Sequence, residues 1–366
     1  MRGRDGRAPI GEPPIGEARR VTMGEYVGLD VSKEETAYCV KREDGVTLAR
    51  GKVSTDPAAL FEVLREHCLC PERIVLETGT MSGWLARGLR ALGLPVDVID
   101  ARQAHAVLKL QRNKTDAGDA ELLAELARTG FCRVVSVKGE AAQAARVLLK
   151  ARTHLVGQRC ATENAIRGLL GSLGIRFPRG AGKLGVRVRA ALEERPDLRA
   201  AIAPLLSVVA ALKREIAGLD REVMARAKSA PACRLLMSVP GVGPVTALAF
   251  VATIDDPARF AKSRAVGAYL GLTTRRYQSG EMDYSGRISK MGDRLLRSLL
   301  YEAANSLLTV VRKAHPLKDW ARRIRKRSSH KKACVALARK LAVILHRMLI
   351  TGEPFRWPEK PAAATA

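Results

Sequence analysis

Aromatic residues are scarce in this sequence, at 4% of 366 residues, although hydrophobic residues together reach 47%. A protein that holds nucleic acid mainly by stacking bases on aromatic rings needs more such side chains. Contacts with phosphate groups are therefore expected to dominate any binding of nucleic acid. The apolar content is still sufficient for most of the chain to fold, and the length allows two or three domains.

Cysteine is also sparse and has no regular spacing. The seven cysteines are odd in number and contain no Cys-x-x-Cys pair, which favours a reducing cytosol over a disulfide framework. His67, Cys68 and Cys70 cluster, but a second pair of zinc ligands is missing, so they are interpreted as ordinary residues at a helix end. The cysteines stand at positions 39, 68, 70, 132, 160, 233 and 334.

Long hydrophobic runs are absent as well. No uninterrupted apolar stretch reaches the ~18–20 residues that span a bilayer, and residues 333–350 are broken by four basic or imidazole side chains. Residues 1–22 carry charge without the apolar centre of a secretory signal, and we interpret them as a mobile basic extension. A cytoplasmic protein associated with the nucleoid, with no membrane partner, is expected.

Positive charge, in contrast, is abundant. Lysine and arginine number 63 against 37 aspartates and glutamates, so the formal net charge is +26. An excess of this size usually indicates a polyanionic partner, either nucleic acid or an anionic membrane surface. The membrane is the weaker candidate, because no apolar run is long enough to span a bilayer.

The first third of the chain alternates between strand and helix patterns. Three strand-like segments run in series from residue 25 to residue 54, and a helix with Asp56 as N-cap and Pro57 at its first position follows. Two further strands, at 73–77 and 95–100, alternate with helices, and residues 115–129 form a helix capped by Thr115. This order predicts a mixed α/β sheet covered by helices, as in an RNase H-like domain.

The remaining chain is predicted to be mostly helical. Residues 141–230 have the helical spacing of two long helices with a looser segment at 174–196, which indicates an antiparallel arm of coiled-coil type. The predicted organisation is a basic extension at 1–22, an α/β domain at 23–140, the arm at 141–230, a mostly α-helical domain at 231–357 and a tail at 358–366.

Four acidic residues in the first domain carry the strongest chemical signal. Asp30 ends the first strand, Glu77 ends the fourth, and Asp116 and Asp119 lie three residues apart on one helix face. Strand ends are where sites assemble in such sheets, and clustered carboxylates are stabilised by sharing Mg²⁺ or Mn²⁺. We predict a metal site for phosphoryl transfer, with Arg112 and Lys114 holding the phosphate backbone. Taken singly, Asp30 is more simply a turn residue and Glu77 a solvated strand end. Asp116 and Asp119 are more simply acids of a first helical turn that interact with the helix dipole.

The segment around Gly241 and Gly243 has the form of a helix-hairpin-helix. Glycines allow the tight turn, and free N–H groups at the next helix start can bind a phosphate oxygen of the DNA backbone. A plain helix–turn–helix packing unit is the alternative.

A loop with the sequence Tyr-Gln-Ser-Gly follows, and Ser279 within it is a candidate nucleophile. A serine that attacks a phosphodiester needs cations on the phosphate, and Arg275, Arg276, Arg287 and Lys290 are close in sequence. From the residues alone, Ser279, Ser285 and Ser289 are hard to separate, and a serine beside glycine is more often a turn former.

A dense basic segment lies at residues 322–332. Because the whole chain is basic, contact with nucleic acid is preferred over a merely solvated face. Its members are Arg322, Arg323, Arg325, Lys326, Arg327, Lys331 and Lys332. The helix after it is expected to dock onto its own domain.

Several segments together resemble the IS one-ten family of insertion-sequence transposases. The resemblance runs through GLDVSKEET, VLETGTMSGWLARGLRALG, NKTDAGDAELLAELARTG, MSVPGVGPVTALAFVATI and QSGEMDYSGRISKMGDRLLRSLLYEAAN, and it covers most of the chain from about residue 24 to residue 357. The first twenty or so residues have no counterpart in the family pattern.

The resemblance implies a RuvC-like (RNase H-like) domain, a coiled-coil arm and a C-terminal transposase domain. It places the family's four acids on Asp30, Glu77, Asp116 and Asp119, and its serine nucleophile on Ser279, which would form a 5′-phosphoserine bond with DNA. It further implies a homo-oligomer, a dimer or tetramer, and a structured bridge RNA that selects donor and target DNA.

Two rival functions remain at this point. One is a metal-dependent junction nuclease that uses water and no serine. The other is a DNA-architectural protein without catalysis, for which replacing Asp30 would leave every activity intact.

Overall fold

The computed structural model describes residues 24–109, 115–178 and 183–356. The chain divides between Lys138 and Gly139 into two compact units. The arm and the C-terminal helices belong to the same compact unit. The predicted boundary between them, and the other predicted domain boundaries, therefore remain predictions. No helix within the described ranges is long and apolar enough to cross a membrane.

A five-stranded mixed sheet forms the centre of the first unit. Its order is β3-β2-β1-β4-β5, with β1 antiparallel to β2, β2 antiparallel to β3, and β1, β4 and β5 parallel. The strands are β1 (Glu25–Val31), β2 (Glu35–Arg42), β3 (Thr47–Ser54), β4 (Pro71–Glu77) and β5 (Val96–Ile99). This confirms the predicted mixed α/β sheet and its helical cover.

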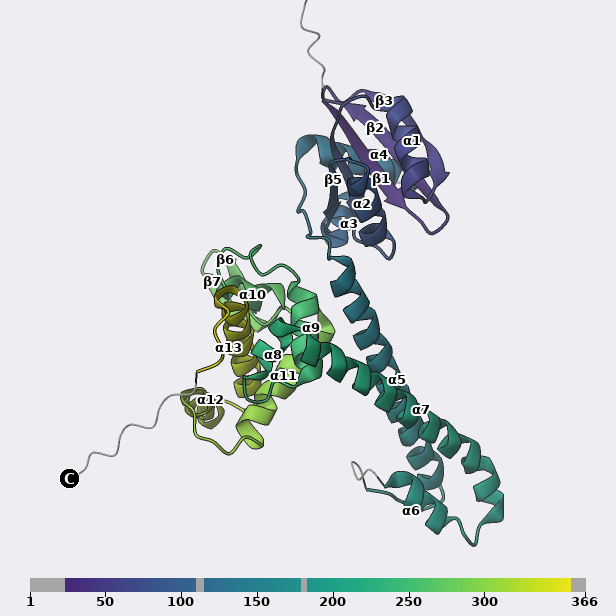
Figure 1. The fold of residues 1–366 in the computed structure, drawn as a ribbon, viewed down its shortest axis with the longest axis vertical. Helices are drawn as coiled ribbons and strands as arrows, with labels where there is room; N and C mark the ends of the chain where they lie inside the picture. Colours follow the sequence, from purple (N-terminus) through teal and green to yellow (C-terminus); the bar gives the residue numbers. More distant parts are fainter. Residues whose placement is uncertain (1–23, 110–114, 179–182, 357–366) are drawn as a thin grey trace, which may run out of the picture. The chain divides into compact units, whose positions relative to one another are not determined.

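Helices cover both faces of this sheet (Figure 1). Leu60 and Leu85, from the helices α1 and α2, pack with Leu29 on one face, and Leu123 of α4 packs with Val75 on the other. The helices are α1 (Pro57–His67), α2 (Ser82–Ala91), α3 (Ala101–Leu108) and α4 (Asp116–Thr129). The two predicted helix starts are confirmed: the Asp56 side chain accepts from the N–H groups of Ala58 and Ala59, and Thr115 accepts from Gly118.

Two long helices begin the second unit and run side by side as an antiparallel arm (Figure 1). They are α5 (Glu140–Gly171) and α7 (Pro196–Ser229), each roughly 50 Å long at 1.5 Å per residue. The connection was predicted to be loose, but it contains the helix α6 (Leu184–Ala191). Val188 of α6 is fully buried with Ile166 and Leu206, so a small apolar core orders this end of the arm.

The rest of the second unit is helical apart from one hairpin. Its core surrounds the fully buried Phe250 and includes Leu337 and Leu341 of the last helix, which docks onto its own domain as predicted. The elements are α8 (Pro231–Met237), α9 (Pro244–Ile254), α10 (Arg264–Tyr269), β6 (Thr274–Ser279), β7 (Met282–Ile288), α11 (Arg294–Thr309), α12 (Pro316–Arg327) and α13 (His330–Thr351).

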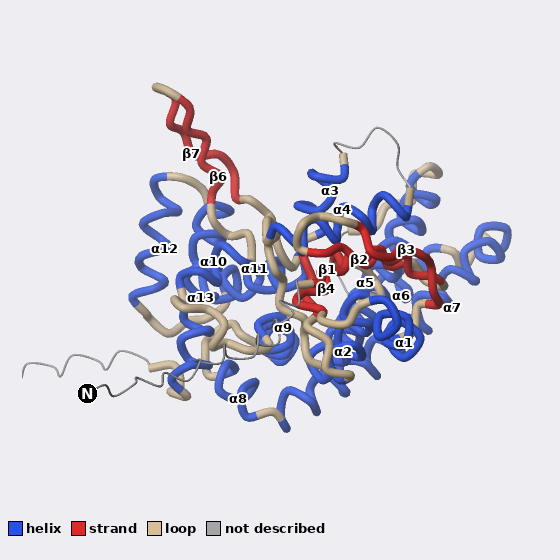
Figure 2. The backbone as a smooth tube through the Cα atoms, turned by 90° about the horizontal axis from the view of Figure 1, so that it is seen from above, coloured by secondary structure: helices blue, strands red, loops and turns tan. Residues whose placement is uncertain are grey.

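The hairpin of β6 and β7 is a departure from the predicted loop. It projects beyond the helices α10, α12 and α13 (Figure 2). Gly280 turns the chain with φ of 55°, which L side chains rarely adopt, and this allows a two-residue turn between the paired Ser279 and Met282. The rings of Tyr277 and Tyr284 stack across the two strands at 4.9 Å.

Candidate active site

Asp30 and Glu77 lie at neighbouring ends of two parallel strands. The register pairs Leu29 with Leu76, the residues immediately before the two acids. Side chains alternate along a strand, and Leu29 and Leu76 pack on the α1/α2 face. Asp30 and Glu77 therefore project from the opposite face, on which α4 lies.

The helix α4 approaches the sheet unusually closely at Gly28. A Cβ atom built on Gly28 would lie 2.1 Å from the Ala120 carbonyl oxygen and 2.2 Å from the Ala124 nitrogen, so only glycine allows this contact. Because Gly28 and Asp30 share a strand face, the first turn of α4 lies beside Asp30. This contact positions Asp116, which is exposed, and Asp119, which is only 5% exposed.

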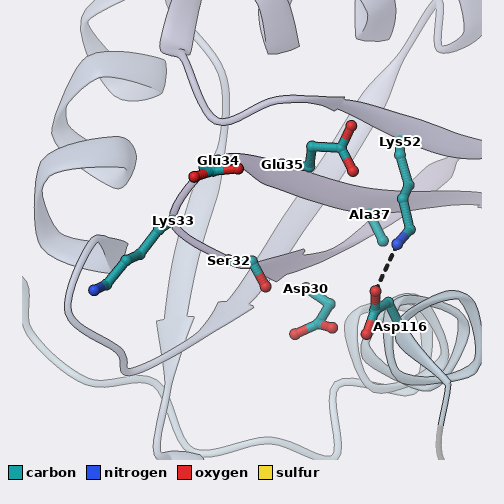
Figure 3. Close-up of a pocket in the computed structure, with 8 residues that line it drawn as sticks. All are labelled: Asp30, Ser32, Lys33, Glu34, Glu35, Ala37, Lys52 and Asp116. Carbon is teal, nitrogen blue, oxygen red and sulfur yellow. Dashed lines mark hydrogen bonds and ion pairs between the residues drawn. The ribbon is translucent and has the colours of Figure 1, made fainter.

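Asp30 and Asp116 line one open pocket of about 400 Å³ (Figure 3). Figure 3 shows both carboxylates at one end of it, with Lys52 reaching from β3 to Asp116, whereas Lys33 points away at the other end. The Lys52 Nζ lies 2.6 Å from the Asp116 Oδ2. The pocket thus contains two of the four predicted acids, and of its two lysines Lys52 is the one that contacts them.

Lys52 is the residue that sequence reasoning missed. The sheet register pairs Lys52 with Ala37 and Ala37 with Asp30, so the three residues form one row across β3, β2 and β1. The hydrogen bond and charge of Asp116, with smaller contributions from Glu35 and Asp30, raise the pKa of Lys52 above its usual value. Lys52 is therefore a cation held within the acidic site.

The donor atoms of this site suit a hard divalent cation. Carboxylate oxygens without sulfur or imidazole favour Mg²⁺ or Mn²⁺. Among the residues that the structure describes, no three His, Cys, Asp or Glu side chains are grouped closely enough to hold a metal ion. The structure thus brings Asp30 and Asp116 to one pocket and Glu77 and Asp119 to the same face of the sheet, and the quartet as a ligand set remains a prediction.

Ser279 ends β6 at the tip of the projecting hairpin and is exposed. Of the two other candidate serines, Ser285 lies lower on β7 opposite Arg276, and the half-buried Ser289 lies at the base, where its N–H donates to the Thr273 carbonyl. Only Ser279 is presented at the extremity of the hairpin.

The four cations predicted to assist Ser279 differ in their surroundings. Arg276 is paired with Asp283 across the strands through two hydrogen bonds of 2.9 and 2.6 Å, which lower the pKa of Asp283. Arg275 donates to the Ser289 carbonyl at 3.3 Å, and Arg287 and Lys290 are exposed. The charge of Arg276 is thus largely neutralised by Asp283 within the hairpin.

Gly241 and Gly243 lie between α8 and α9, an arrangement common to a helix-hairpin-helix and to a plain helix–turn–helix packing unit. Gly241 has φ of 85°, and a Cβ there would lie 2.5 Å from the Ala303 carbonyl oxygen of α11. The first glycine is therefore needed for packing. Gly243 has open space around it and caps α9 without a side-chain hydrogen bond.

The basic segment 322–332 is interrupted. Arg322, Arg323, Arg325, Lys326 and Arg327 belong to α12, and Lys331 and Lys332 belong to the first turn of α13. Ser328 and Ser329 separate the two groups, and Ser329 caps α13 by accepting from the Lys332 N–H. All seven side chains are exposed. The two remaining predicted cations, Arg112 and Lys114, lie outside the described residues.

Comparison with known proteins shows which family the chain is similar to. Residues 233–319 match the family described as "Transposase IS116/IS110/IS902 family", and residues 27–175 match a transposase domain of the DEDD type from IS110 elements. The chain is 30% identical to the transposase for insertion sequence element IS1111A of Coxiella burnetii, across 93% of this chain and 94% of the relative. It is 31% identical to a probable family 20 transposase of Pseudomonas aeruginosa, across 88% and 96%.

Proposed function

Because the chain belongs to the IS116/IS110/IS902 transposase family, we propose that it moves an insertion sequence by cutting and rejoining DNA with an acidic metal site and a serine nucleophile. Membership implies a DNA-binding enzyme with a dependence on divalent metal. Beyond family membership, the proposal assigns the individual residues that bind the metal and attack the DNA. Its main support is the packing of α4 on Gly28, which brings Asp116 into one pocket with Asp30.

The proposed ligands are Asp30, Glu77, Asp116 and Asp119, and the proposed metal is Mg²⁺ or Mn²⁺. When bound there, the metal would stabilise negative charge on the attacking and leaving oxygens of the phosphodiester. Lys52 would then release Asp116 and be available to the phosphate.

Ser279 is proposed as the nucleophile. Its Oγ forms a bond to phosphorus, the bond from phosphorus to the 3′ oxygen breaks, and the proton from Oγ leaves to solvent while the 3′ oxygen takes one up. The products are a 5′-phosphate on Ser279 and a free 3′-hydroxyl. Arg275 and Arg287, exposed on the same hairpin, would neutralise the phosphate. Rejoining is the reverse reaction with a different 3′-hydroxyl.

The acids and the serine belong to different units of the chain. The proposal therefore requires both to act on one phosphate, within one chain or between subunits of a homo-oligomer. A structured guide RNA encoded beside the gene is proposed to choose the donor and target DNA.

The test is covalent capture of DNA by the full-length protein. Labelled duplex spanning the ends of the insertion sequence is incubated with Mg²⁺, with and without RNA transcribed from the flanking DNA, and adducts are resolved on denaturing gels. We expect an adduct at the peptide containing Ser279, lost in Ser279→Ala and retained in Ser289→Ala. Asp30→Asn and EDTA are expected to abolish cutting.

Each rival predicts a different outcome. Cutting without an adduct in the wild type would indicate hydrolysis by water, as in a junction nuclease. Unchanged activity of Asp30→Asn would indicate an architectural protein, and cutting in EDTA would exclude the metal site. Equal adduct with and without the RNA would remove the guide from the proposal.

A further inference from the structure

A large groove lies at the base of the β6–β7 hairpin, between this hairpin, α10, α12 and α13. Its volume is about 1500 Å³, above the 300–1,000 Å³ typical of small-molecule sites. We name it the basal groove; its lining includes Arg264, Ser285, Ile288, Trp320, Lys332 and Val343. It lies entirely within the second unit.

The rim of the basal groove is strongly positive. Seven lysines and arginines line it and no acidic residue does. Within the described part of this domain, the ion pairs with carboxylates are made by other arginines, and none of the seven cations takes part in them. Like charges gathered in one groove repel one another unless a polyanion binds there. The seven cations are Arg264, Arg287, Lys290, Lys331, Lys332, Arg339 and Lys340.

Two of these cations are held in place by their stems or neighbours. The Nζ of Lys340 lies 4.1 Å from the centre of the Trp320 ring, a cation–π contact that joins α13 to α12. The Arg339 stem packs against Gly267 of α10, where a Cβ would lie 3.1 Å from the Arg339 Cγ. Ordered cations lose less conformational entropy when a phosphate binds.

The floor of the basal groove is apolar. Val335, Val343 and Ile344 of α13 are half-buried there, on the same helix face as Lys332 and Arg339. The opposite face of α13, with Leu337 and Leu341, is buried in the core. Duplex DNA keeps the faces of its bases stacked inside, and only an unpaired strand can place bases on such a floor.

The hairpin connects this groove with the proposed nucleophile. Ser285 and Ile288 line the basal groove, and Ser279 lies at the tip of the same hairpin. Ser285 pairs with Arg276, three residues from Ser279, so the groove begins roughly 10 Å below the tip at 3.3 Å per residue. A strand cut at the tip can thus continue along the hairpin into the groove.

We infer that the basal groove binds an unpaired DNA strand adjacent to the cut phosphate, with cations on its backbone and bases on the apolar floor. The choice of DNA rests on the proposed function of Ser279, whereas the preference for an unpaired strand rests on the groove itself. The groove would hold the cut end in place until it is rejoined.

The test measures binding without cutting. Full-length protein in EDTA is titrated into a labelled 12-nucleotide DNA strand, the same sequence as duplex, and the same sequence as RNA, and anisotropy is followed over a range of salt. The charge variant is the double substitution Lys332→Gln with Arg339→Gln, and its matched control is Arg323→Gln with Lys326→Gln on α12. The floor variant is Val343→Thr, which keeps charge and size. Thermal melting checks that each variant is folded.

We expect the charge variant to lose about tenfold or more in single-strand affinity and to reduce the salt slope by about 1.4, at ~0.7 per phosphate contact. The control should weaken strand and duplex equally. Val343→Thr should weaken the single strand severalfold with an unchanged salt slope, because only base contacts are lost. Tighter binding of RNA or of duplex, or a charge variant that behaves like its control, would overturn the inference.

The proposed function fails separately. Ser279→Ala should keep full single-strand affinity, since Ser279 lies outside the groove. If the strand binds as expected and no adduct ever forms, the groove stands and the nucleophile does not. If the wild type forms adducts normally while the charge and floor variants bind the strand as tightly as the wild type, Ser279 stands as the nucleophile and the groove does not bind the strand.

Discussion

The Lys52 Nζ donates a hydrogen bond of 2.6 Å to the Asp116 Oδ2, in a pocket that both residues share with Asp30. This ammonium group partly neutralises the carboxylate charge that a divalent metal would otherwise neutralise. The raised pKa of Lys52 has the same cause, since Asp116 and Asp30 both favour its charged form. A metal bound at the proposed site would therefore compete with Lys52 for Asp116.

Replacing Lys52 by methionine keeps the apolar stem and removes the competing charge. We expect Lys52→Met to bind Mn²⁺ a few-fold more tightly, because Asp116 no longer has to leave a cation; the gain is modest since both partners are about half exposed. Titration followed by electron paramagnetic resonance measures this without catalysis. Lys33→Met, in the same pocket but pointing away from the acids, serves as the control and should bind as the wild type does. Weaker binding in Lys52→Met would mean that Lys52 supports the metal site.

Gly28 sets the distance between α4 and the sheet. We expect Gly28→Ala to destabilise the first unit by about 3 kcal/mol or more, because the new methyl group overlaps backbone atoms of Ala120 and Ala124 that can move only with the whole helix. Urea unfolding measures the loss, and Mn²⁺ affinity should fall with it as Asp116 moves from Asp30.

The control for this substitution is Gly83→Ala in α2. Its added Cβ would meet only the end of the Arg87 side chain, at 3.7 Å, so the change should be neutral or stabilising by roughly 0.5–1 kcal/mol. If Gly28→Ala unfolds like Gly83→Ala, α4 does not depend on the close contact.

Local chemistry explains which parts of the fold could be predicted from the sequence. The caps at Asp56 and Thr115 depend on residues two or three positions away, and the strands of the buried sheet carry a clear apolar pattern. The β6–β7 hairpin does not, because every residue of β6 is exposed and its strands are held by pairing and by the Tyr277–Tyr284 stack. The strand β6 therefore has no alternation of buried and exposed positions from which it could be predicted.

Site residues divide in the same way. The placement of Asp30 and Glu77 at neighbouring strand ends could be predicted, because each lies at the end of a recognisable strand. Lys52 could not, because its place beside Asp116 depends on the register of three strands and on the contact of α4 with Gly28. Likewise, the pairing of Arg276 with Asp283 depends on the register of the hairpin and could not be predicted from the positions of the basic residues in the sequence.

Asp283 forms an ion pair with Arg276 and partly neutralises its charge. We expect Asp283→Asn to raise affinity for DNA severalfold and to steepen the salt dependence by up to about 0.9 for duplex, because Arg276 becomes available to a phosphate. Anisotropy titrations in EDTA over a range of salt measure both effects. Glu281→Gln, which removes the same charge from the turn, is the control for a general change in field. Equal effects of the two substitutions would show that net charge alone matters and that the ion pair with Arg276 does not.

The helix α12 carries five of the predicted DNA-binding cations. The stability of its first turn should depend on pH through His315. The Nδ1 of this buried side chain accepts a hydrogen bond from the Leu317 N–H at 3.0 Å and so must be unprotonated, and burial lowers its pKa below the usual 6.5. With a lowered folded-state pKa, the stabilisation is complete above about 6.5 and is lost as pH falls through that lowered value. We expect faster amide exchange at the first turn of α12 at pH 5 than at pH 7.5, after correction for intrinsic rates. His315→Asn keeps a capping side chain that does not titrate, and it should remove this difference. A pH dependence that survives in His315→Asn would assign the effect to another group.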